Sequence, residues 1–176
     1  LFYFNHHNTH HSPYEQVCHQ IEKLLADLNV HEVSEPRVVE IPVCYGGEYG
    51  PDLEEVARIN GLTPEEVVEI HANGEYVVYA LGFAPGFPYI GGMSKKIAAP
   101  RRKTPRLITP AGSVGIAGIQ TGVYPIETPG GWQLIGRTPL KLFKPESNPP
   151  SLLMAGDKIK FKPMTLDEFE KWEETS

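Results

Sequence analysis

Prolines and glycines are dense between residues 81 and 131, where the sequence holds 7 prolines and 10 glycines. A long helix is not compatible with this composition, because proline lacks a backbone donor and glycine favours turns. Short apolar segments lie among the turns: SVGIAGI (113–119), GVYPI (122–126), WQLIG (132–136), LKLF (140–143) and DKIKF (157–161). Closely spaced short strands are typical of an all-β sandwich or barrel with long loops.

The beginning of the chain has a different character. LFYFN (1–5) has the composition of a strand and no initiator Met, so we expect it to belong to an element whose partners precede the chain. A helix is predicted for 12–30, because apolar residues recur at helical spacing after the N-cap candidate Ser12. RVVEIPVCY (37–45) is predicted to be a strand, with its proline favouring an edge or a strand end.

Three more helices are predicted from capping signals, at 51–60, 63–73 and 165–174. The first two form a pair around Gly61 that resembles a helix-turn-helix. However, residues 52–71 contain six acidic residues and one arginine, which opposes docking on a polyanion. We therefore expect no nucleic-acid partner, and we expect these helices to cover the end of a sheet.

Charge is distributed unevenly along the chain, whose net charge is −6. Residues 1–75 contain 14 acidic and 3 basic residues, whereas residues 76–126 contain no acidic residue and 6 basic ones. A window of one sign in an acidic protein indicates an anionic partner or substrate. The alternative is a basic loop paired with acidic residues elsewhere in the fold.

Several classes of site are disfavoured. All seven histidines lie at or before residue 71, so a Ser-His or Cys-His nucleophile is not expected in the basic half. Two cysteines are too few for a disulfide framework or a zinc cluster, and HHNTHH (6–11) is interpreted as a polar turn rather than a metal site. No apolar run approaches the roughly 18 to 20 residues of a membrane span, and no signal peptide is evident, so a cytoplasmic location and no membrane partner are expected.

The segment LGFAPGFPYIGG (81–92) combines aromatic residues with turn formers. Phe83, Pro85, Gly86 and Phe87 are therefore candidates for binding a small substrate. Together with Tyr89 and Trp132, the two phenylalanines are also candidates for a groove that binds a partner protein. The alternative is that the phenylalanines fill the end of the barrel.

Glycine-rich segments provide the other substrate-binding candidates: Gly112, Ser113, Gln120, Gly130, Gly131 and Trp132. The spacing fits neither a P-loop nor a dinucleotide fingerprint. The glycines could cradle a ligand or let strands bend, and Trp132 could form a pocket wall or belong to the core.

The basic segment PRRKTPR (100–106) is stiffened by its prolines. Its arginines would therefore lose little entropy on binding a carboxylate or phosphate bidentately. Arg101, Arg102 and Arg106 are the candidate catalytic residues.

These motifs, with PAGSVGIAGIQTGVYPIETPGGWQLIGRTP (110–139) and AGDKIKF (155–161), resemble the allophanate hydrolase subunit 1 family, whose members are also called B subunits of 5-oxoprolinase. The resemblance is strongest to its member that inhibits a sporulation histidine kinase. It implies an α+β, mainly β chain: a cyclophilin-like antiparallel β-barrel at 35–176, after a short α/β remnant at 1–34.

The resemblance also implies a function. A B subunit works with a C subunit and an A subunit to open 5-oxoproline to glutamate at the expense of ATP, and the inhibitory member blocks autophosphorylation of a sensor histidine kinase. Opening a lactam through phosphorylation needs cations around the phosphoryl group. ATP and Mg²⁺ are expected only in the assembled complex, with none bound by this chain alone. The alternatives are a purely protein-binding regulator, or a component of a biotin-dependent urea carboxylase and allophanate hydrolase system.

Overall fold

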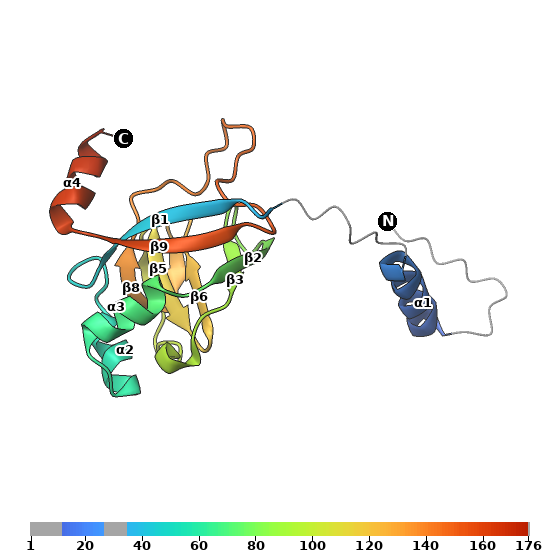
Figure 1. The fold of residues 1–176 in the computed structure, drawn as a ribbon, viewed down its shortest axis with the longest axis horizontal. Coiled ribbons are helices and arrows are strands. Elements are labelled where there is room, and N and C mark those ends of the chain that lie inside the picture. Colours follow the sequence, from blue (N-terminus) through green and yellow to red (C-terminus); the bar gives the residue numbers. More distant parts are fainter. Residues whose placement is uncertain (1–11, 27–34, 176) are drawn as a thin grey trace. The chain divides into compact units, whose positions relative to one another are not determined.

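The computed structural model describes residues 12–26 and 35–175, and the chain divides into two compact units, Leu1–Glu35 and Pro36–Ser176 (Figure 1). In the first unit, α1 (Pro13–Ala26) follows Ser12, whose hydroxyl accepts a hydrogen bond from the Glu15 backbone N–H. The strand predicted for LFYFN, the turn predicted for HHNTHH and the predicted helical residues 27–30 lie outside the described residues.

The second unit is a closed barrel with the strand order β1-β8-β5-β6-β3-β2-β9. Its strands are β1 (Val38–Tyr45), β2 (Tyr76–Leu81), β3 (Pro88–Gly91), β5 (Ser113–Ala117), β6 (Gln120–Val123), β8 (Gln133–Arg137) and β9 (Lys158–Met164). The predicted class, a mainly β barrel with helices, is confirmed. Strand β3 begins within the proline- and glycine-rich segment 81–92, where a single proline starts the strand and costs no interior hydrogen bond.

One pair of strands departs from the predicted antiparallel pattern. Strands β1 and β9 run parallel from Val38 opposite Lys158 to Cys44 opposite Met164, and they lie side by side in Figure 1. On its other side, β1 pairs with β8 only at Cys44 and Tyr45. Pro42 therefore interrupts no hydrogen bond to β8, which explains why a proline is tolerated inside this strand.

A buried histidine, His71, connects two strands of the barrel through its two ring nitrogens. The Nδ1 of His71 lies 2.8 Å from the Tyr45 hydroxyl, and its Nε2 lies 2.9 Å from the Thr121 hydroxyl. Thr121 donates its own proton to the Gly115 carbonyl, so it accepts from Nε2–H, and Nδ1 accepts from Tyr45. Burial lowers the pKa of His71 to about 3, so the ring is neutral and structural.

The paired helices form where capping signals predicted them. Helix α2 (Leu53–Asn60) ends at Gly61, which has a φ of 65°. Helix α3 (Pro64–Ala72) begins with a capping box between Thr63 and Glu66. Buried side chains of both helices, including Val56 and Val67, belong to the barrel core. The pair therefore covers the barrel, as expected.

The last helix and a small sheet complete this unit. Helix α4 (Leu166–Thr175) follows Thr165, whose hydroxyl accepts from the Glu168 backbone N–H. Strands β4 (Arg106–Thr109) and β7 (Thr128–Gly130) form a separate two-stranded sheet that the turn-rich sequence did not indicate. LKLF (140–143) was wrongly predicted as a strand: apart from an isolated bridge at Phe143, it is irregular, and its Leu142 is buried in the core.

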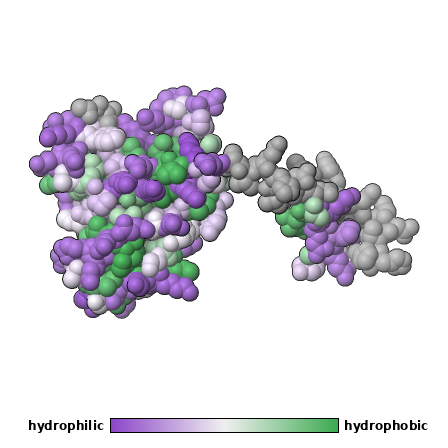
Figure 2. Space-filling view, viewed as in Figure 1, coloured by the Kyte–Doolittle hydropathy of each residue, from purple (hydrophilic) through white to green (hydrophobic). Residues whose placement is uncertain are grey.

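Hydrophilic side chains dominate the face of the barrel unit seen in Figure 2, and hydrophobic ones gather in a few places between them. Within the described residues, no helix combines the length and apolar character needed to cross a membrane.

Candidate functional site

A cavity of about 210 Å³ opens beside Trp132, and we call it the Trp132 pocket. It brings together residues far apart in sequence, from the 82–87 loop to β7. Its lining consists of Phe83, Phe87, Tyr89, Arg101, Gln120, Tyr124, Pro129, Gly130, Gly131 and Trp132. Eight of these ten were predicted as site residues from the sequence; Tyr124 and Pro129 were not.

The 82–87 loop is a tight turn closed by a hydrogen bond from the Gly82 N–H to the Phe87 carbonyl, at 3.0 Å. Phe87 is 4% exposed and packs into a small aromatic core with Tyr124. Phe83, in contrast, is 72% exposed and has a φ of 68°, a left-handed conformation that is unusual for a bulky residue. The barrel-end alternative therefore holds for Phe87 but not for Phe83.

Trp132 lies over a pair of glycines that face each other across β5 and β6. Gly115 is paired with Gly122, and a Cβ at Gly122 would lie 3.0 Å from Trp132 Cζ3. A Cβ at Gly115 would lie 3.1 Å from Trp132 Cβ. These glycines make room for the indole rather than cradle a ligand. Trp132 is thus both a packed residue, edge-on to Phe87 at 6.0 Å, and a pocket wall.

A buried carboxylate organises the basic segment. Asp52 Oδ1 accepts hydrogen bonds from Arg102 Nη1 and Arg106 Nη2, each at 2.8 Å. Its Oδ2 accepts from the Leu134 backbone N–H at 2.7 Å. The Asp52 side chain is 7% exposed, so this pairing is largely shielded from water. The alternative of a basic loop paired with an acidic residue therefore applies to Arg102 and Arg106.

Arg101 is oriented differently from its neighbours. It lines the Trp132 pocket, and among the described residues it has no ion-pair partner. The backbone on either side is fixed, since Arg102 N–H donates to the Gly131 carbonyl at 2.8 Å and the Pro100 carbonyl accepts from Gln133 Nε2 at 2.9 Å. Arg101 therefore supplies the pocket with one guanidinium group that can bind a ligand.

Tyr124 adds a hydroxyl to the same lining. Burial raises its pKa, and this effect exceeds the lowering by the Trp132 backbone N–H and by the charges of Arg101 and Arg106. The phenol therefore keeps its proton at neutral pH and can donate a hydrogen bond to a ligand.

Four residues predicted to bind substrate lie outside the pocket lining. Pro85 is exposed on the 82–87 loop. Gly86 has a φ of 76° and packs on Phe143, so it shapes the turn. Gly112 and Ser113 are buried at the start of β5, where a Cβ at Gly112 would lie 2.3 Å from the Thr138 carbonyl oxygen. Their glycine pattern reflects backbone packing rather than ligand contact.

No sequence pattern indicated the role of Asp52. Its position before α2 suggests an ordinary helix cap, yet its side chain makes no capping hydrogen bond because it is turned toward the arginines. Its partners lie 50 and 54 residues away. The one available signal was the imbalance of charge, which left open an acidic partner elsewhere in the fold without indicating which residue it is.

Comparisons with known proteins agree on one family. Residues 2–153 match the model described as "Carboxyltransferase domain, subdomain C and D". The chain is 64% identical over 165 residues to the B subunit of 5-oxoprolinase from Bacillus subtilis, covering 94% of this chain and 69% of that protein. The chain spans about two thirds of the length of the curated 5-oxoprolinase B subunits it matches, at 69%, 66% and 69%.

More distant relatives and solved structures extend the comparison. A putative urea carboxylase of Emericella nidulans is 29% identical over 145 residues, which cover 77% of this chain and 12% of that protein. A crystal structure of a conserved protein from Pyrococcus horikoshii aligns with a TM-score of 0.74 and 49% identity, covering 90% of this chain and 72% of that one. The same barrel is therefore present in an experimentally determined relative.

Proposed function

The chain belongs to the family of 5-oxoprolinase B subunits, and on this premise we propose that it is the B subunit of an ATP-dependent 5-oxoprolinase that opens 5-oxoproline to L-glutamate. The observation that carries this proposal is the high identity, over nearly the whole chain, to the B subunit from Bacillus subtilis. The C and A subunits complete the enzyme. ATP and Mg²⁺ act in the assembled complex.

The chemistry explains why such a reaction uses ATP. A lactam carbonyl is a poor electrophile, and transfer of the γ-phosphoryl group of ATP to its oxygen makes the carbon open to attack by water. ADP is released in the phosphoryl transfer. Attack by one water followed by cleavage of the ring C–N bond gives the amine and an acyl phosphate, and a second water hydrolyses that acyl phosphate to the carboxylate of glutamate and inorganic phosphate. Cationic groups stabilise the transferred charge, and no histidine is required.

The Trp132 pocket supports the proposal that this chain supplies one part of a shared active site. It offers one guanidinium, from Arg101, and aromatic walls. Of the three arginines proposed as catalytic, Arg101 remains the candidate for ligand contact. Arg102 and Arg106 act as positioning residues through Asp52.

Reconstitution tests this function. The chain is combined with candidate C and A subunits, and 5-oxoproline-dependent release of ADP and glutamate is measured. We expect turnover only when all subunits are present. Equal turnover without this chain, or robust turnover by this chain alone, would contradict the proposal. Urea-dependent ATP hydrolysis in place of 5-oxoproline cleavage would favour the alternative urea carboxylase system.

Inhibition of a sensor histidine kinase is a second candidate function. The observation that favours it is the exposed aromatic rim of the pocket, where Phe83 is 72% and Tyr89 is 43% exposed. Such a rim suits a helix or proline-containing segment of a partner. Phe83→Ala should weaken binding to the kinase, measured as loss of autophosphorylation inhibition, whereas Arg101→Glu should have a smaller effect. The reverse order would argue against the rim as the kinase site.

A further inference from the structure

We infer that the Trp132 pocket binds a small cyclic carboxylate, the lactam acid itself, and not the phosphates of the nucleotide. The inference deepens the proposed function and rests on it for the identity of the lactam. It assigns separate places to the two substrates: 5-oxoproline on this chain, and the nucleotide on partner subunits.

The size of the pocket is the first reason. Its volume is about 210 Å³, whereas sites for drug-sized ligands usually occupy ~300–1,000 Å³. A nucleoside triphosphate is at least drug-sized, and it would leave most of its atoms outside this cavity. A five-membered ring that carries one carboxylate can be enclosed.

Charge is the second reason. Asp52 occupies the guanidinium groups of Arg102 and Arg106, which leaves Arg101 as the cation in the described lining. One planar guanidinium matches one carboxylate in a bidentate pair. A triphosphate with its Mg²⁺ needs several donors and acidic metal ligands. The described residues that line this pocket include no aspartate or glutamate.

The remaining lining complements the rest of the lactam acid. The rings of Phe83 and Trp132 offer apolar surfaces to ring CH₂ groups. The Gln120 side-chain amide has one donor and one acceptor side, which suits the paired N–H and C=O of a lactam. A carboxylate, an apolar ring and a cis amide thus each find a chemical counterpart.

The backbone of Phe83 is the third and independent reason. A non-glycine residue with a φ of 68° is held at a cost in free energy, here at the centre of a turn in which the Ala84 N–H donates to the Gly82 carbonyl at 2.8 Å, and this turn leaves the Phe83 side chain 72% exposed. Residues held in such conformations concentrate at ligand clamps. Phe83 contacts Phe87 edge-on at 5.4 Å and stands at the pocket rim, where it can cover a bound ring and exclude water.

Ligand binding by the full chain tests the inference by calorimetry, with four probes. 5-Oxoproline has both functional groups, cyclopentanecarboxylate lacks the lactam, 2-pyrrolidinone lacks the carboxylate, and Mg·ATP represents the nucleotide. We expect binding of 5-oxoproline, weaker binding of cyclopentanecarboxylate, and the weakest binding of 2-pyrrolidinone. Mg·ATP should neither bind the chain alone nor displace 5-oxoproline. Failure of 5-oxoproline to bind at millimolar concentration, or its displacement by Mg·ATP, overturns the inference.

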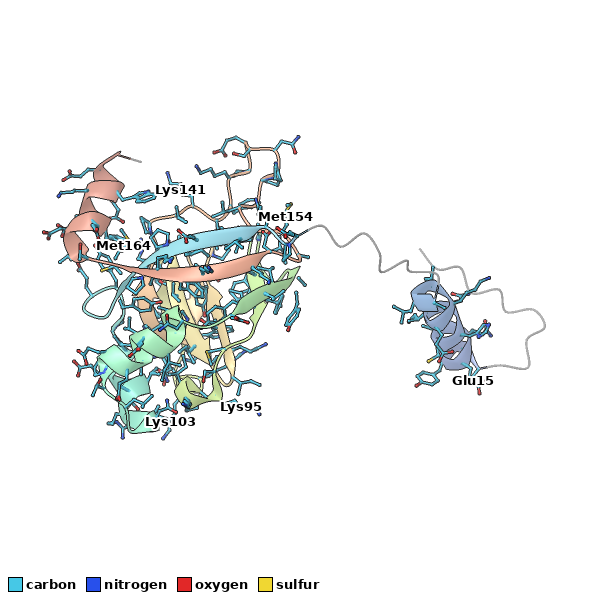
Figure 3. The ribbon with its side chains drawn as sticks, in the orientation of Figure 1. Glu15, Lys95, Lys103, Lys141, Met154 and Met164 are labelled. Carbon is cyan, nitrogen blue, oxygen red and sulfur yellow. The ribbon has the colours of Figure 1, made fainter. Side chains whose placement is uncertain are left out.

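Three variants locate the site. Arg101→Gln should weaken 5-oxoproline binding by about tenfold to a hundredfold, since a hydrogen-bonded charge is removed. Lys103→Gln is the matched control: it removes one charge two residues away, outside the pocket lining, and should leave binding unchanged (Figure 3 labels Lys103). Phe83→Gly removes the strained side chain without threatening the fold, and should weaken binding several-fold. Equal effects of Arg101→Gln and Lys103→Gln would show only a diffuse charge effect and overturn the inference.

The site assignment and the proposed function can fail separately. If the reconstituted enzyme turns over and Arg101→Gln does not raise its KM for 5-oxoproline, the pocket assignment is overturned. The proposed function then remains intact. Absence of turnover, with 5-oxoproline still bound in an Arg101-dependent manner, overturns the proposed function and leaves the carboxylate site in place.

Discussion

Replacing Asp52 by asparagine tests whether one carboxylate holds the basic segment in place. The substitution preserves shape but removes the charge that accepts hydrogen bonds from Arg102 and Arg106. Breaking a fully buried ion pair costs about 3–5 kcal/mol. Here the side chains of Arg102 and Arg106 are 37% and 21% exposed, so water recovers part of that loss. We expect the free energy of unfolding to fall by about 2–3 kcal/mol.

Urea denaturation followed by tryptophan fluorescence measures this change. The matched control is Glu55→Gln in α2, which breaks an exposed carboxylate–arginine pair with Arg58. That change should leave the unfolding midpoint where it is, because exposed pairs contribute little. If Asp52→Asn also leaves the midpoint unchanged, the buried carboxylate does not hold Arg102 and Arg106 in place.

Three further predictions concern the barrel. In the folded protein His71 has a pKa of about 3, whereas in the unfolded chain its pKa is near 6.5. Between these values only the unfolded chain binds a proton at this residue. The free energy of unfolding should therefore decrease as the pH falls below 6.5, by up to ~1.4 kcal/mol per pH unit. Denaturation curves between pH 7 and about pH 5 check the slope, which His71→Gln should remove. Gly122→Ala should destabilise the fold by about 1–3 kcal/mol and alter the near-ultraviolet circular dichroism, since the new Cβ meets the rigid Trp132 ring; an unchanged spectrum would contradict this packing. Burial raises the pKa of Asp157, but the hydrogen bond from Arg37 and that from the Met154 backbone N–H lower it more, so this carboxylate stabilises the fold at neutral pH and the contribution is lost as the pH falls through its lowered pKa. Arg37→Gln should lower the melting temperature at pH 7 and should move the acid loss to higher pH; equal melting temperatures for the variant and the parent chain would refute this.

Local signals in the sequence were enough to predict the helices. Gly61 supplies a left-handed C-cap, and Thr63 with Glu66 forms a capping box, so each boundary depends on residues a few positions apart. The barrel class followed from the density of turn formers. Strand β4, which begins at Arg106, was missed because its four residues lie between two prolines and show no alternation of apolar and polar side chains.

The site could be predicted only in part, for the same reason. Aromatic and glycine motifs indicated most of the pocket lining, because two short segments, 83–89 and 129–132, supply seven of its ten residues. The choice between Arg101 and its neighbours depends on Asp52, which lies 50 and 54 positions before Arg102 and Arg106 and meets them through the tertiary fold. The role of Gly122 depends on which residue faces it across the strands, and this register is not encoded within either segment alone.

The parallel pairing of β1 with β9 has a consequence for how the protein is made. These strands, Val38–Tyr45 and Lys158–Met164, stand about 120 positions apart, yet they close the ring. During synthesis β1 is made first and β9 last among the barrel strands. Until β9 has been made, the backbone groups of β1 on the side of β9 are unpaired. Closure of such a long loop is slow, and the waiting edge is open to wrong partners. Nascent chains that stop before Lys158 should therefore have an open sheet edge that is prone to aggregation. They should depend on chaperones until β9 has been synthesised.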